Sequence, residues 1–408
     1  MNTSIFRIRC LMFLILGTFG TPSYSWAATI NAASCSQSAV QSAINSASNG
    51  DTVKVPAGNC NWGANVNIGS KAITLQGSGV GQTNITHNVS GSQVKLVQFT
   101  QHAVISTRIT GFSFLGGTYD RRFVGCNGDG NYTSAPMRID NNSFTSGSGS
   151  IQLDFFSCRG LIDHNQLTAV NNSELIHNWG SGTSGWSADV TPGSTNALYI
   201  EANTFYNGSI GGWGTQSTIQ SYDAARTVAR YNTFNDSQVD THGGSNIGTR
   251  WFEFYENTFN TAFSSWQQSF DIRAGSGVIY NNHKTGVPNN PAIMLRYECR
   301  SGDTQYRVGE GINRVHWSPV YIWGNDTSLP IAYSTGAECN SSSITPGVNF
   351  IALSSQPASM KLWQQSTHNA NTTYSYVPFT YPYPLDSNSM PNPSVTLIQP
   401  PTDVKIVP

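Results

Sequence analysis

The side chains best suited to chemistry lie in a series of short alternating strands. These strands are SIQLDFF at 150–156, SELIHNW at 173–179, TIQSYDA at 218–224, QVDTHGG at 238–244, SFDIRAG at 269–275 and AIMLRYE at 292–298. Successive side chains of a strand point to opposite faces, so the apolar residues of each strand share one face. The other face of the later strands then carries Gln220, Tyr222, Asp240, His242, Asp271, Arg273, Arg296 and Glu298.

This second face is distinctive because ionisable residues are scarce. Asp, Glu, Lys and Arg make up 11% of the 408 residues. The pattern nevertheless places acids, an imidazole, a phenol and two guanidinium groups in one strip, and we find no such concentration on the other expected faces. The strip is therefore our candidate active site.

Its residue types suit the β-elimination of a uronic-acid polysaccharide. That reaction needs a group that neutralises the C6 carboxylate, a base for the C5 proton and an acid for the departing glycosidic oxygen. Arg273 and Arg296 could hold the carboxylate with their planar guanidinium groups. His242, whose ordinary pKa is about 6.5, is the expected base, and Tyr222 is the expected proton donor.

Two other functions use the same residues. If adjacent coils place Asp240 and Asp271 about 5 Å apart, they match the carboxylate spacing of a retaining glycosidase. A noncatalytic carbohydrate-binding or adhesion protein is the second alternative. In that case, charged pairs such as Asp240 with Arg273 are surface ion pairs that each contribute little stability.

Aromatic residues near the strip are candidates for sugar stacking. They are His177, Trp179, Trp186, Trp213 and Trp266. Lys284 follows an asparagine in a different column, and we expect it to be a solvated turn residue.

A recurring strand ending indicates how these residues are positioned. The endings NNSF, ANTF and YNTF, with looser copies, align Asn142, Asn165, Asn203, Asn232, Asn257, Asn282 and Asn325. Most of the intervals are near 25 residues, which predicts a β-solenoid whose coils stack at about 4.8 Å. Asparagine suits the corner of each coil because it tolerates left-handed backbone angles and its amide can bond to neighbouring coils. Phe144, Phe205, Phe234 and Phe259 should then stack inside.

The ends of the solenoid are predicted from composition. The stretch SQSAVQSAINSASNG has helical apolar spacing and predicts a short capping helix ahead of the first coils. Residues 346–408 are rich in Pro and Tyr and predict an irregular tail that packs along the solenoid of residues 28–345.

The chain resembles the right-handed parallel β-helix proteins of the pectin-lyase-like superfamily. The resemblance covers about residues 30–345 and rests on AVQSAINSASNGDTVKVPAGNCNW, ITLQGSG and the IDNNSF and IDHNQL coils. It implies an all-β, single-stranded parallel β-helix. In the pectate-lyase-like families acidic side chains hold calcium, which neutralises the substrate carboxylate, and a Lys or Arg takes the proton. On this chain the implied ligands are Asp240, Asp271 and Glu298, with Arg273 as base.

The first 27 residues predict an exported protein. Arg7 and Arg9 precede the apolar run CLMFLILGTFG, and Ser25-Trp26-Ala27 forms a cleavage motif, as in a secretory signal peptide. Six cysteines follow, and the simplest pairing predicts the disulfides 35/60, 126/158 and 299/339. We therefore expect a secreted or periplasmic protein.

The charge balance limits the partners. The formal net charge is −1 at pH 7, which argues against a nucleic-acid binder, because such a protein needs a basic patch. No stretch after the signal is apolar enough to cross a membrane. We expect a monomer whose partner is an acidic polysaccharide.

Overall fold

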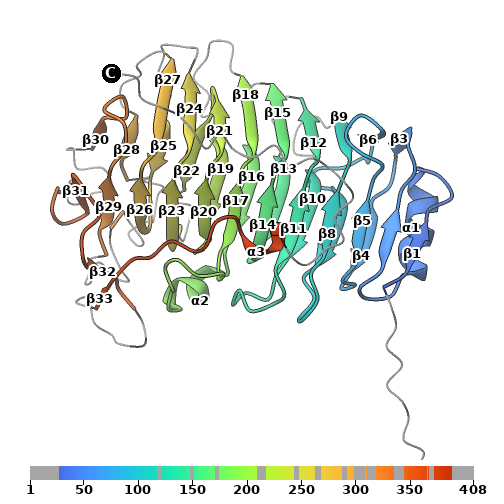
Figure 1. Ribbon diagram of the computed structural model, residues 1–408, viewed down its shortest axis with the longest axis horizontal. Helices are drawn as coiled ribbons and strands as arrows, with labels where there is room; N and C mark the ends of the chain where they lie inside the picture. The colour runs from blue at the N-terminus through green and yellow to red at the C-terminus, as the bar shows by residue number, and fades with distance from the viewer. Residues whose placement is uncertain are drawn as a thin grey trace, which may run out of the picture.

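The computed structural model describes the β-helix and part of the C-terminal tail. The described residues are 27–116, 122–147, 151–170, 174–208, 217–242, 248–261, 268–286, 292–297, 308–309, 318–334, 344–364, 366 and 372–387. Three long parallel sheets, which we name A, B and C, run the length of the molecule (Figure 1). The chain visits them in the order A, B, C once per coil. The predicted right-handed parallel β-helix is confirmed.

The strands of each sheet follow one another along the helix axis. Sheet A contains β1 (Thr29–Asn31), β2 (Thr52–Lys54), β5 (Thr74–Gln76), β8 (Arg108–Thr110), β11 (Met137–Asp140), β14 (Gly160–Asp163), β17 (Leu198–Glu201), β20 (Arg226–Arg230), β23 (Trp251–Tyr255), β26 (Ser276–Tyr280), β29 (Val320–Trp323) and β31 (Phe350–Leu353). Sheet B contains β3 (Gly58–Trp62), β6 (Thr83–His87), β9 (Ser113–Gly116), β12 (Ser143–Ser146), β15 (Gln166–Val170), β18 (Thr204–Gly208), β21 (Thr233–Asn235), β24 (Thr258–Thr261) and β27 (His283–Gly286). Sheet C contains β4 (Val66–Gly69), β7 (Lys95–Thr100), β10 (Arg122–Asn127), β13 (Ile151–Phe156), β16 (Glu174–Trp179), β19 (Ser217–Tyr222), β22 (Gln238–Thr241), β25 (Phe270–Ile272), β28 (Ile293–Leu295) and β30 (Ile331–Tyr333).

The predicted asparagine ladder forms the corner between sheets A and B. The Asn232 backbone N–H donates to Asn257 Oδ1 at 3.1 Å, and Asn232 Nδ2 donates to the same oxygen at 3.0 Å and to the Ile200 carbonyl at 2.8 Å. The same bonds link the other asparagines from Asn142 to Asn325. The left-handed backbone angle belongs to the preceding residue, such as Tyr231 with φ of 56°, and not to the asparagine. The asparagine therefore satisfies buried backbone groups, while its neighbour turns the chain.

The interior is filled by stacked apolar side chains. Phe205 and Phe234 stack at 4.9 Å between ring centroids, and Phe234 and Phe259 stack at 4.8 Å, as predicted. The next residue in this column is Lys284, which pairs in register with Phe259 and is 7% exposed. The expectation of a solvated Lys284 is wrong, because β27 continues sheet B and places residue 284 in the inward column.

The helix α1 (Gln37–Ser46) covers the N-terminal end of the solenoid, as predicted (Figure 1). Its buried face consists of Val40, Ala43 and Ile44. Lys71 Nζ donates to the carbonyl oxygens of Ile44, Asn45 and Ala47, each at 2.8 Å, which satisfies the open C-terminal end of the helix.

The C-terminal segment 372–387 runs along the outer face of sheet A and ends in α3 (Pro384–Ser387) (Figure 1). Arg230 donates to the carbonyl oxygens of Phe379 at 2.6 Å and Thr380 at 2.9 Å, and the Tyr383 N–H donates to Glu201 at 2.9 Å. Sheet A extends through β31 to Leu353, eight residues past the predicted boundary at 345. A small antiparallel pair joins β32 (Met360–Lys361) to β33 (Thr373–Tyr374).

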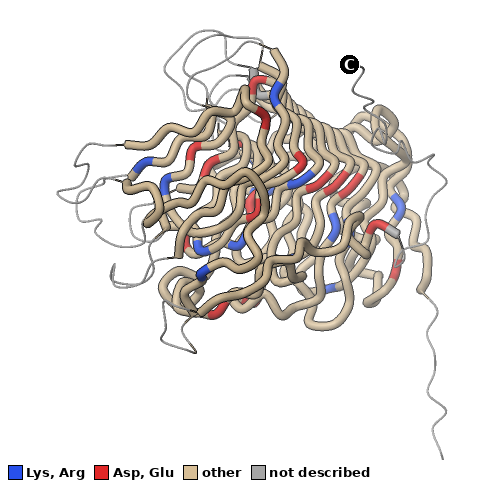
Figure 2. The backbone as a smooth tube through the Cα atoms, turned by 60° about the vertical axis from the view of Figure 1, so that its left-hand side comes forward, with Lys and Arg blue, Asp and Glu red and all other residues tan. Residues whose placement is uncertain are grey.

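Charged residues also recur on the outer face of sheet A, contrary to our expectation. Figure 2 shows acidic positions repeating side by side on neighbouring coils. The ion pairs of this face join Arg108 to Asp140, Arg138 to Asp163, and Arg230 to Glu201. All six residues lie in strands of sheet A, so the alternation of RIT, MRID, GLID and LYIE carried this signal, which the prediction did not use.

Two of the three predicted disulfides are present, Cys35–Cys60 and Cys126–Cys158. Cys299 and Cys339 lie outside the described residues, as do the first 26 residues with the predicted signal. None of the helices in the described part of the chain has the length and apolar character that a bilayer-spanning helix requires.

Candidate functional site

The predicted strip lies on the outer face of sheet C. Trp179 pairs in register with Tyr222, while the N–H groups of His242, Arg273 and Arg296 each continue the ladder from the preceding coil. The inward positions of these strands hold Ile219, Val239, Phe270 and Ile293, in register and fully buried, as the alternation predicted. Tyr222, His242, Arg273 and Arg296 therefore form one column on one wall, and their chemical roles remain predictions.

The middle of the column is a continuous ring stack. Trp179 and Tyr222 stack with centroids 4.3 Å apart, and Tyr222 and His242 stack at 4.4 Å. Phe156 extends the stack from the other side of Trp179 at 5.8 Å and is 37% exposed. The faces of the stacked rings cover one another, so the stack presents ring edges to the outside, and Tyr222 and His242 are 8% and 7% exposed.

The C-terminal half of the strip consists of arginines paired with buried aspartates. Arg296 donates from Nε and Nη2 to the two oxygens of Asp271 at 2.8 and 2.5 Å. Arg273 binds Asp240 in the same two-bond manner, and its Nε lies 3.6 Å from Asp271 Oδ2. Both aspartate side chains are fully buried, whereas the Arg296 side chain is 34% exposed. Arg296 is thus the better placed of the two to meet a substrate carboxylate.

The sequence analysis missed the basic and acidic residues at the other end of the strip. Asp154, which is fully buried, accepts hydrogen bonds from Arg122 and, at 3.1 Å, from Trp179 Nε1, and it lies 3.2 Å from Lys95 Nζ. Lys95 also lies over the Phe156 ring at 4.7 Å. These contacts fix the edge of the ring stack. The signal was available in SIQLDFF, where Asp154 is an outward position.

Glu174 is a second residue that the sequence analysis missed. Its carboxylate bonds to His177 Nε2, and its other oxygen accepts from Gln220 Nε2 at 2.6 Å. The His177 ring lies edge-on to Tyr222 at 5.3 Å. His177 Nδ1 and Gln220 Oε1 are buried without a hydrogen-bond partner in the described part of the chain. This arrangement fixes the orientation of the imidazole behind Tyr222.

Two carboxyl groups of the strip have shifted pKa values. Burial raises the pKa of Asp240 to about 7, against the opposing effect of Arg273. Burial also raises the pKa of Glu174, but the hydrogen bonds from His177 and Gln220 outweigh it, so the pKa is lowered overall. Glu174 is therefore ionised at neutral pH, and its side chain is 33% exposed.

The structure describes two of the three predicted calcium ligands. Asp240 and Asp271 each have both oxygens engaged by an arginine, so a cation there would have to displace a guanidinium group. Glu298 lies outside the described residues. The calcium site stays a prediction.

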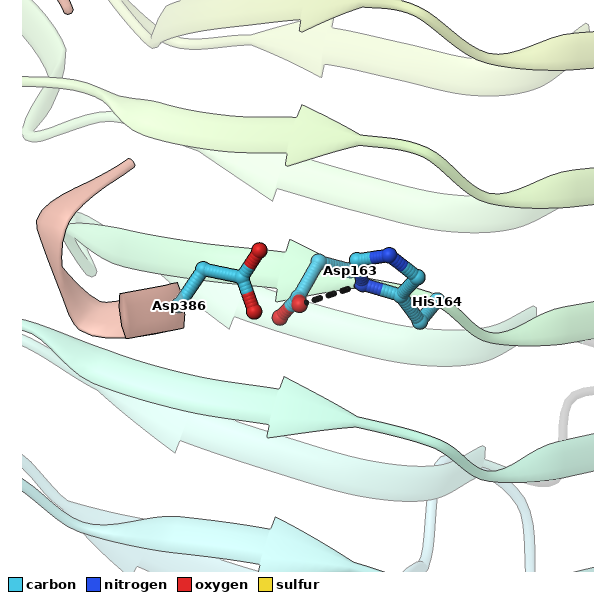
Figure 3. Close-up of side chains that lie close together, drawn as sticks. All are labelled: Asp163, His164 and Asp386. Atoms are coloured by element: carbon cyan, nitrogen blue, oxygen red, sulfur yellow. Dashed lines mark hydrogen bonds and ion pairs between the residues drawn. The ribbon is translucent and has the colours of Figure 1, made fainter. Parts of the chain in front are cut away.

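Among the described residues, one group has its potential ligand atoms close enough to hold a metal, namely Asp163, His164 and Asp386 (Figure 3). It lies between sheet A and α3. Asp163 accepts from His164 Nδ1 at 2.8 Å and from Arg138 Nη2 at 2.7 Å, and Arg138 Nη2 also donates to Asp386 at 2.5 Å. The cluster is thus a hydrogen-bonded junction that attaches the tail to the solenoid.

The structure places the predicted sugar-stacking residues in different surroundings. His177 and Trp179 lie in the strip. Trp186, in α2 (Gly182–Ser187), is 1% exposed and packs against Arg250, so the prediction that it stacks on a sugar is wrong. Trp363, which lies far along the chain, packs on the same arginine. Trp213 and Trp266 lie outside the described residues.

The sequence matches no protein-family model and no curated protein. Among solved structures, the chain is similar to the alginate lyase from Paenibacillus sp. str. FPU-7, with 15% sequence identity and a TM-score of 0.35 over 73% of this chain and 86% of that chain. It is also similar to the catalytic domain of a GH87 alpha-1,3-glucanase in complex with nigerose, with 11% identity and a TM-score of 0.29 over 81% of this chain and 68% of that chain. At these TM-scores neither similarity supports a conclusion about activity.

Proposed function

We propose that the chain is a polysaccharide lyase that cleaves a uronic-acid-containing glycan by β-elimination on the outer face of sheet C. The observation that carries the proposal is the column in which Trp179, Tyr222 and His242 stack and continue through Arg273 to the partly exposed guanidinium group of Arg296. It joins a base, a proton donor and a carboxylate-binding cation within one column.

Each group then has a defined task. Arg296, supported by Arg273, holds the C6 carboxylate of the substrate, which makes the C5 proton acidic. His242 takes that proton, and the electrons of the C5–H bond form a C4=C5 double bond as the C4–O bond breaks. Tyr222 protonates the departing oxygen. His242 and Tyr222 return to their starting protonation states by exchange with water.

The length of the face suits a long glycan. At about 4.8 Å per coil, the distance from β7 to β28 is about 34 Å, which accommodates several sugar units. Lys95 and Arg122 lie at one end of this path and Arg273 and Arg296 at the other. Unlike the covered charges of sheet A, parts of this face reach solvent at Phe156, Glu174 and Arg296.

Hydrolysis by the pair Asp240 and Asp271 is less well supported. Both carboxylates are fully buried and held by arginines, so neither is positioned to attack a sugar carbon. Noncatalytic glycan binding is the second candidate. The strip aspartates pair with arginines of the protein itself, as the acids of sheet A do. This pairing favours noncatalytic binding.

The deciding experiment incubates the purified protein with pectate, alginate and glucuronan, with and without a chelator. Ultraviolet absorbance reports unsaturated ends, and a reducing-sugar assay reports all chain cleavage. We expect absorbance and reducing ends to rise together with one of these glycans. Reducing ends without absorbance would indicate hydrolysis instead.

The other outcomes are also informative. If the chelator abolishes activity, a calcium ion neutralises the C6 carboxylate of the substrate, and Arg273 is the base. If activity survives chelation, Arg296 is supported as the group that neutralises the substrate carboxylate. Binding without cleavage of every acidic glycan would contradict the lyase and support the noncatalytic candidate.

A further inference from the structure

The first strand of sheet A is held by a buried carboxylate. β1 pairs with β2 in parallel register, beginning with Thr29 opposite Thr52, and the Thr52 N–H donates to the Ala28 carbonyl at 2.8 Å. The N–H of Ala28 donates to Asp51 Oδ1 at 2.7 Å. The other carboxylate oxygen of Asp51 accepts from the Ser48 N–H at 2.8 Å. Asp51 therefore binds the residue at which the chain enters the solenoid.

Asp51 has no cationic partner in the part of the chain that the structure describes. It is 6% exposed, and both of its hydrogen bonds come from neutral backbone N–H groups. The other titratable groups of this corner have different contacts. Lys71 Nζ donates to three carbonyl oxygens at the end of α1, His102 Nε2 lies 3.3 Å from Asn49 Nδ2, and Lys54 is exposed at the end of β2. A buried charge is costly unless it is paired, so a cation beside Asp51 would stabilise the fold.

The sequence before Ala28 supplies a route to such a cation. A signal peptide ends in a small residue and has a second small residue two positions earlier. Ala27 and Ser25 occupy these positions for cleavage between Ala27 and Ala28. Cleavage one bond later would put Trp26 at the earlier position and would remove the Ala28 carbonyl from the β1–β2 ladder. The sequence motif and the ladder thus favour the same bond.

We propose that a peptidase of the export machinery hydrolyses the Ala27–Ala28 peptide bond and that the ammonium group created on Ala28 forms an ion pair with Asp51. Water adds its oxygen to the Ala27 carbonyl carbon, the C–N bond breaks, and both protons of the water end on the Ala28 nitrogen. The released peptide then ends in a carboxylate. The nitrogen that becomes the ammonium group already lies 2.7 Å from Asp51 Oδ1.

This ion pair couples processing to stability. One N–H of the ammonium group replaces the amide donor, so a neutral hydrogen bond becomes a charge-assisted one. Asp51 also binds Ser48, which lies between α1 and β2, so the pair joins the first strand to the N-terminal cap. The unprocessed chain keeps only the amide bond. This site is separate from the sheet C strip and does not depend on the proposed lyase activity.

The first test identifies the terminus of the exported protein. The full chain, with its own first 27 residues, is expressed in a secreting bacterial host, and the exported product is analysed by N-terminal sequencing and intact mass. We expect the product to begin with Ala28, followed by Thr29, Ile30 and Asn31. Any other terminus would overturn the proposal.

The second test measures the ammonium group in the native, processed protein. Reductive methylation with ¹³C-formaldehyde labels amines without removing their charge, and an NMR titration then gives the pKa of the Ala28 amine. Its ordinary pKa is about 7.7–8.0, and we expect a value about one unit higher, because a nearby carboxylate favours the charged form. Asp51→Asn should return the pKa to the ordinary range. An ordinary value in the native protein would overturn the ion pair, even if the terminus is correct.

The third test keeps Asp51 and moves the charge. A protein with one additional glycine ahead of Ala28, released from a cleavable tag, retains the amide N–H that binds Asp51 but carries its ammonium group elsewhere. At pH 7 its Tm should be about 2 °C below that of the processed protein, which is the effect of one pKa unit in a chain of this size. An amine whose pKa is raised on folding stabilises the native state fully below its ordinary pKa, and this stabilisation is lost as pH rises through the folded value. The difference should therefore disappear at about pH 10. Equal Tm values at pH 7 would contradict the proposal.

Discussion

The guanidinium group of Arg273 makes two hydrogen bonds to the carboxylate of Asp240 on the preceding coil. The Asp240 side chain is fully buried, and Ser217 Oγ donates to it at 2.9 Å. The pair therefore holds two coils together in addition to any part in chemistry. Arg296 binds Asp271 in the same manner one coil further on, but it is partly exposed.

This contrast predicts unequal stability effects. Arg273→Ala leaves a buried carboxylate without its main partner and should lower the free energy of unfolding by about 3–5 kcal/mol. Arg296→Ala should cost less, because the pair is partly solvated and Asp271 keeps Arg273 Nε within 3.6 Å. Urea unfolding followed by circular dichroism measures both. Equal losses would show that exposure does not set the strength of these pairs.

Tyr222→Phe tests the proton donor. The substitution keeps the ring stacked between Trp179 and His242 and removes only the hydroxyl group. On the glycan identified by the absorbance assay, we expect kcat to fall about 10²–10⁴-fold with little change in KM. Tyr206→Phe, on the exposed side of β18, is the matched control and should keep full activity. An unchanged kcat in Tyr222→Phe would remove this residue from the mechanism.

His242→Gln tests the base separately. Glutamine fills much of the imidazole volume but cannot take the C5 proton, so we expect a loss of kcat of similar size. The melting temperature should fall modestly, because the backbone bond from His242 N–H to Ser221 is kept while the stacking of the imidazole on Tyr222 is lost. Retained activity would shift the role of base to His177 or Arg273, which the pH dependence of kcat would then distinguish.

The attachment of the tail should depend on pH. The hydrogen bond with Asp163 raises the pKa of His164, although burial opposes this effect. A histidine whose pKa is raised on folding stabilises the native state fully below its ordinary pKa of about 6.5, and this stabilisation is lost as pH rises through the higher folded value. Tm should therefore fall as the pH rises above about 6.5 and through the raised pKa of His164. His164→Gln should remove this part of the pH dependence, and His283→Gln, on an exposed corner, should keep it.

The asparagine ladder should be sensitive to truncation. Asn232→Ala leaves the Ile200 carbonyl and the Asn203 N–H unpaired in the interior and should cost at least about 3 kcal/mol. Asn235→Ala, three residues later on the partly exposed face of β21, removes bonds to the Phe205 carbonyl and from Asn260 that water can replace in part, so this comparison variant should cost less. Equal costs would mean that the corner is held by backbone geometry alone.

The sequence predicted the coils because its strongest signals repeat at every turn. Asn232 and Phe234 have equivalents on many coils, so period and alternation identified both the corner and the inward column. The column of Tyr222, His242, Arg273 and Arg296 followed from the same alternation. Lys284 was misplaced because an inward lysine breaks the apolar pattern on which the prediction relied.

Contacts between distant segments could not be predicted in this way. Trp186 occupies a glycine-rich stretch that indicates an exposed loop, but it is buried, and residues 362–364 contact the segment that follows it. The bonds from Arg138 and Arg230 to carbonyl oxygens of the tail are a second example. Such partners are set by tertiary packing, and no local pattern reports them.

From β8 to β27 the corner between sheets A and B keeps the same length. Two residues separate β14 from β15, β17 from β18, and β20 from β21, although the intervals between neighbouring asparagines range from 23 to 43 residues. An insertion at this corner would disconnect one asparagine from both neighbours, so evolutionary growth and protein engineering must both use the other two corners. Foreign loops grafted there could change what the molecule recognises while its spine stays intact.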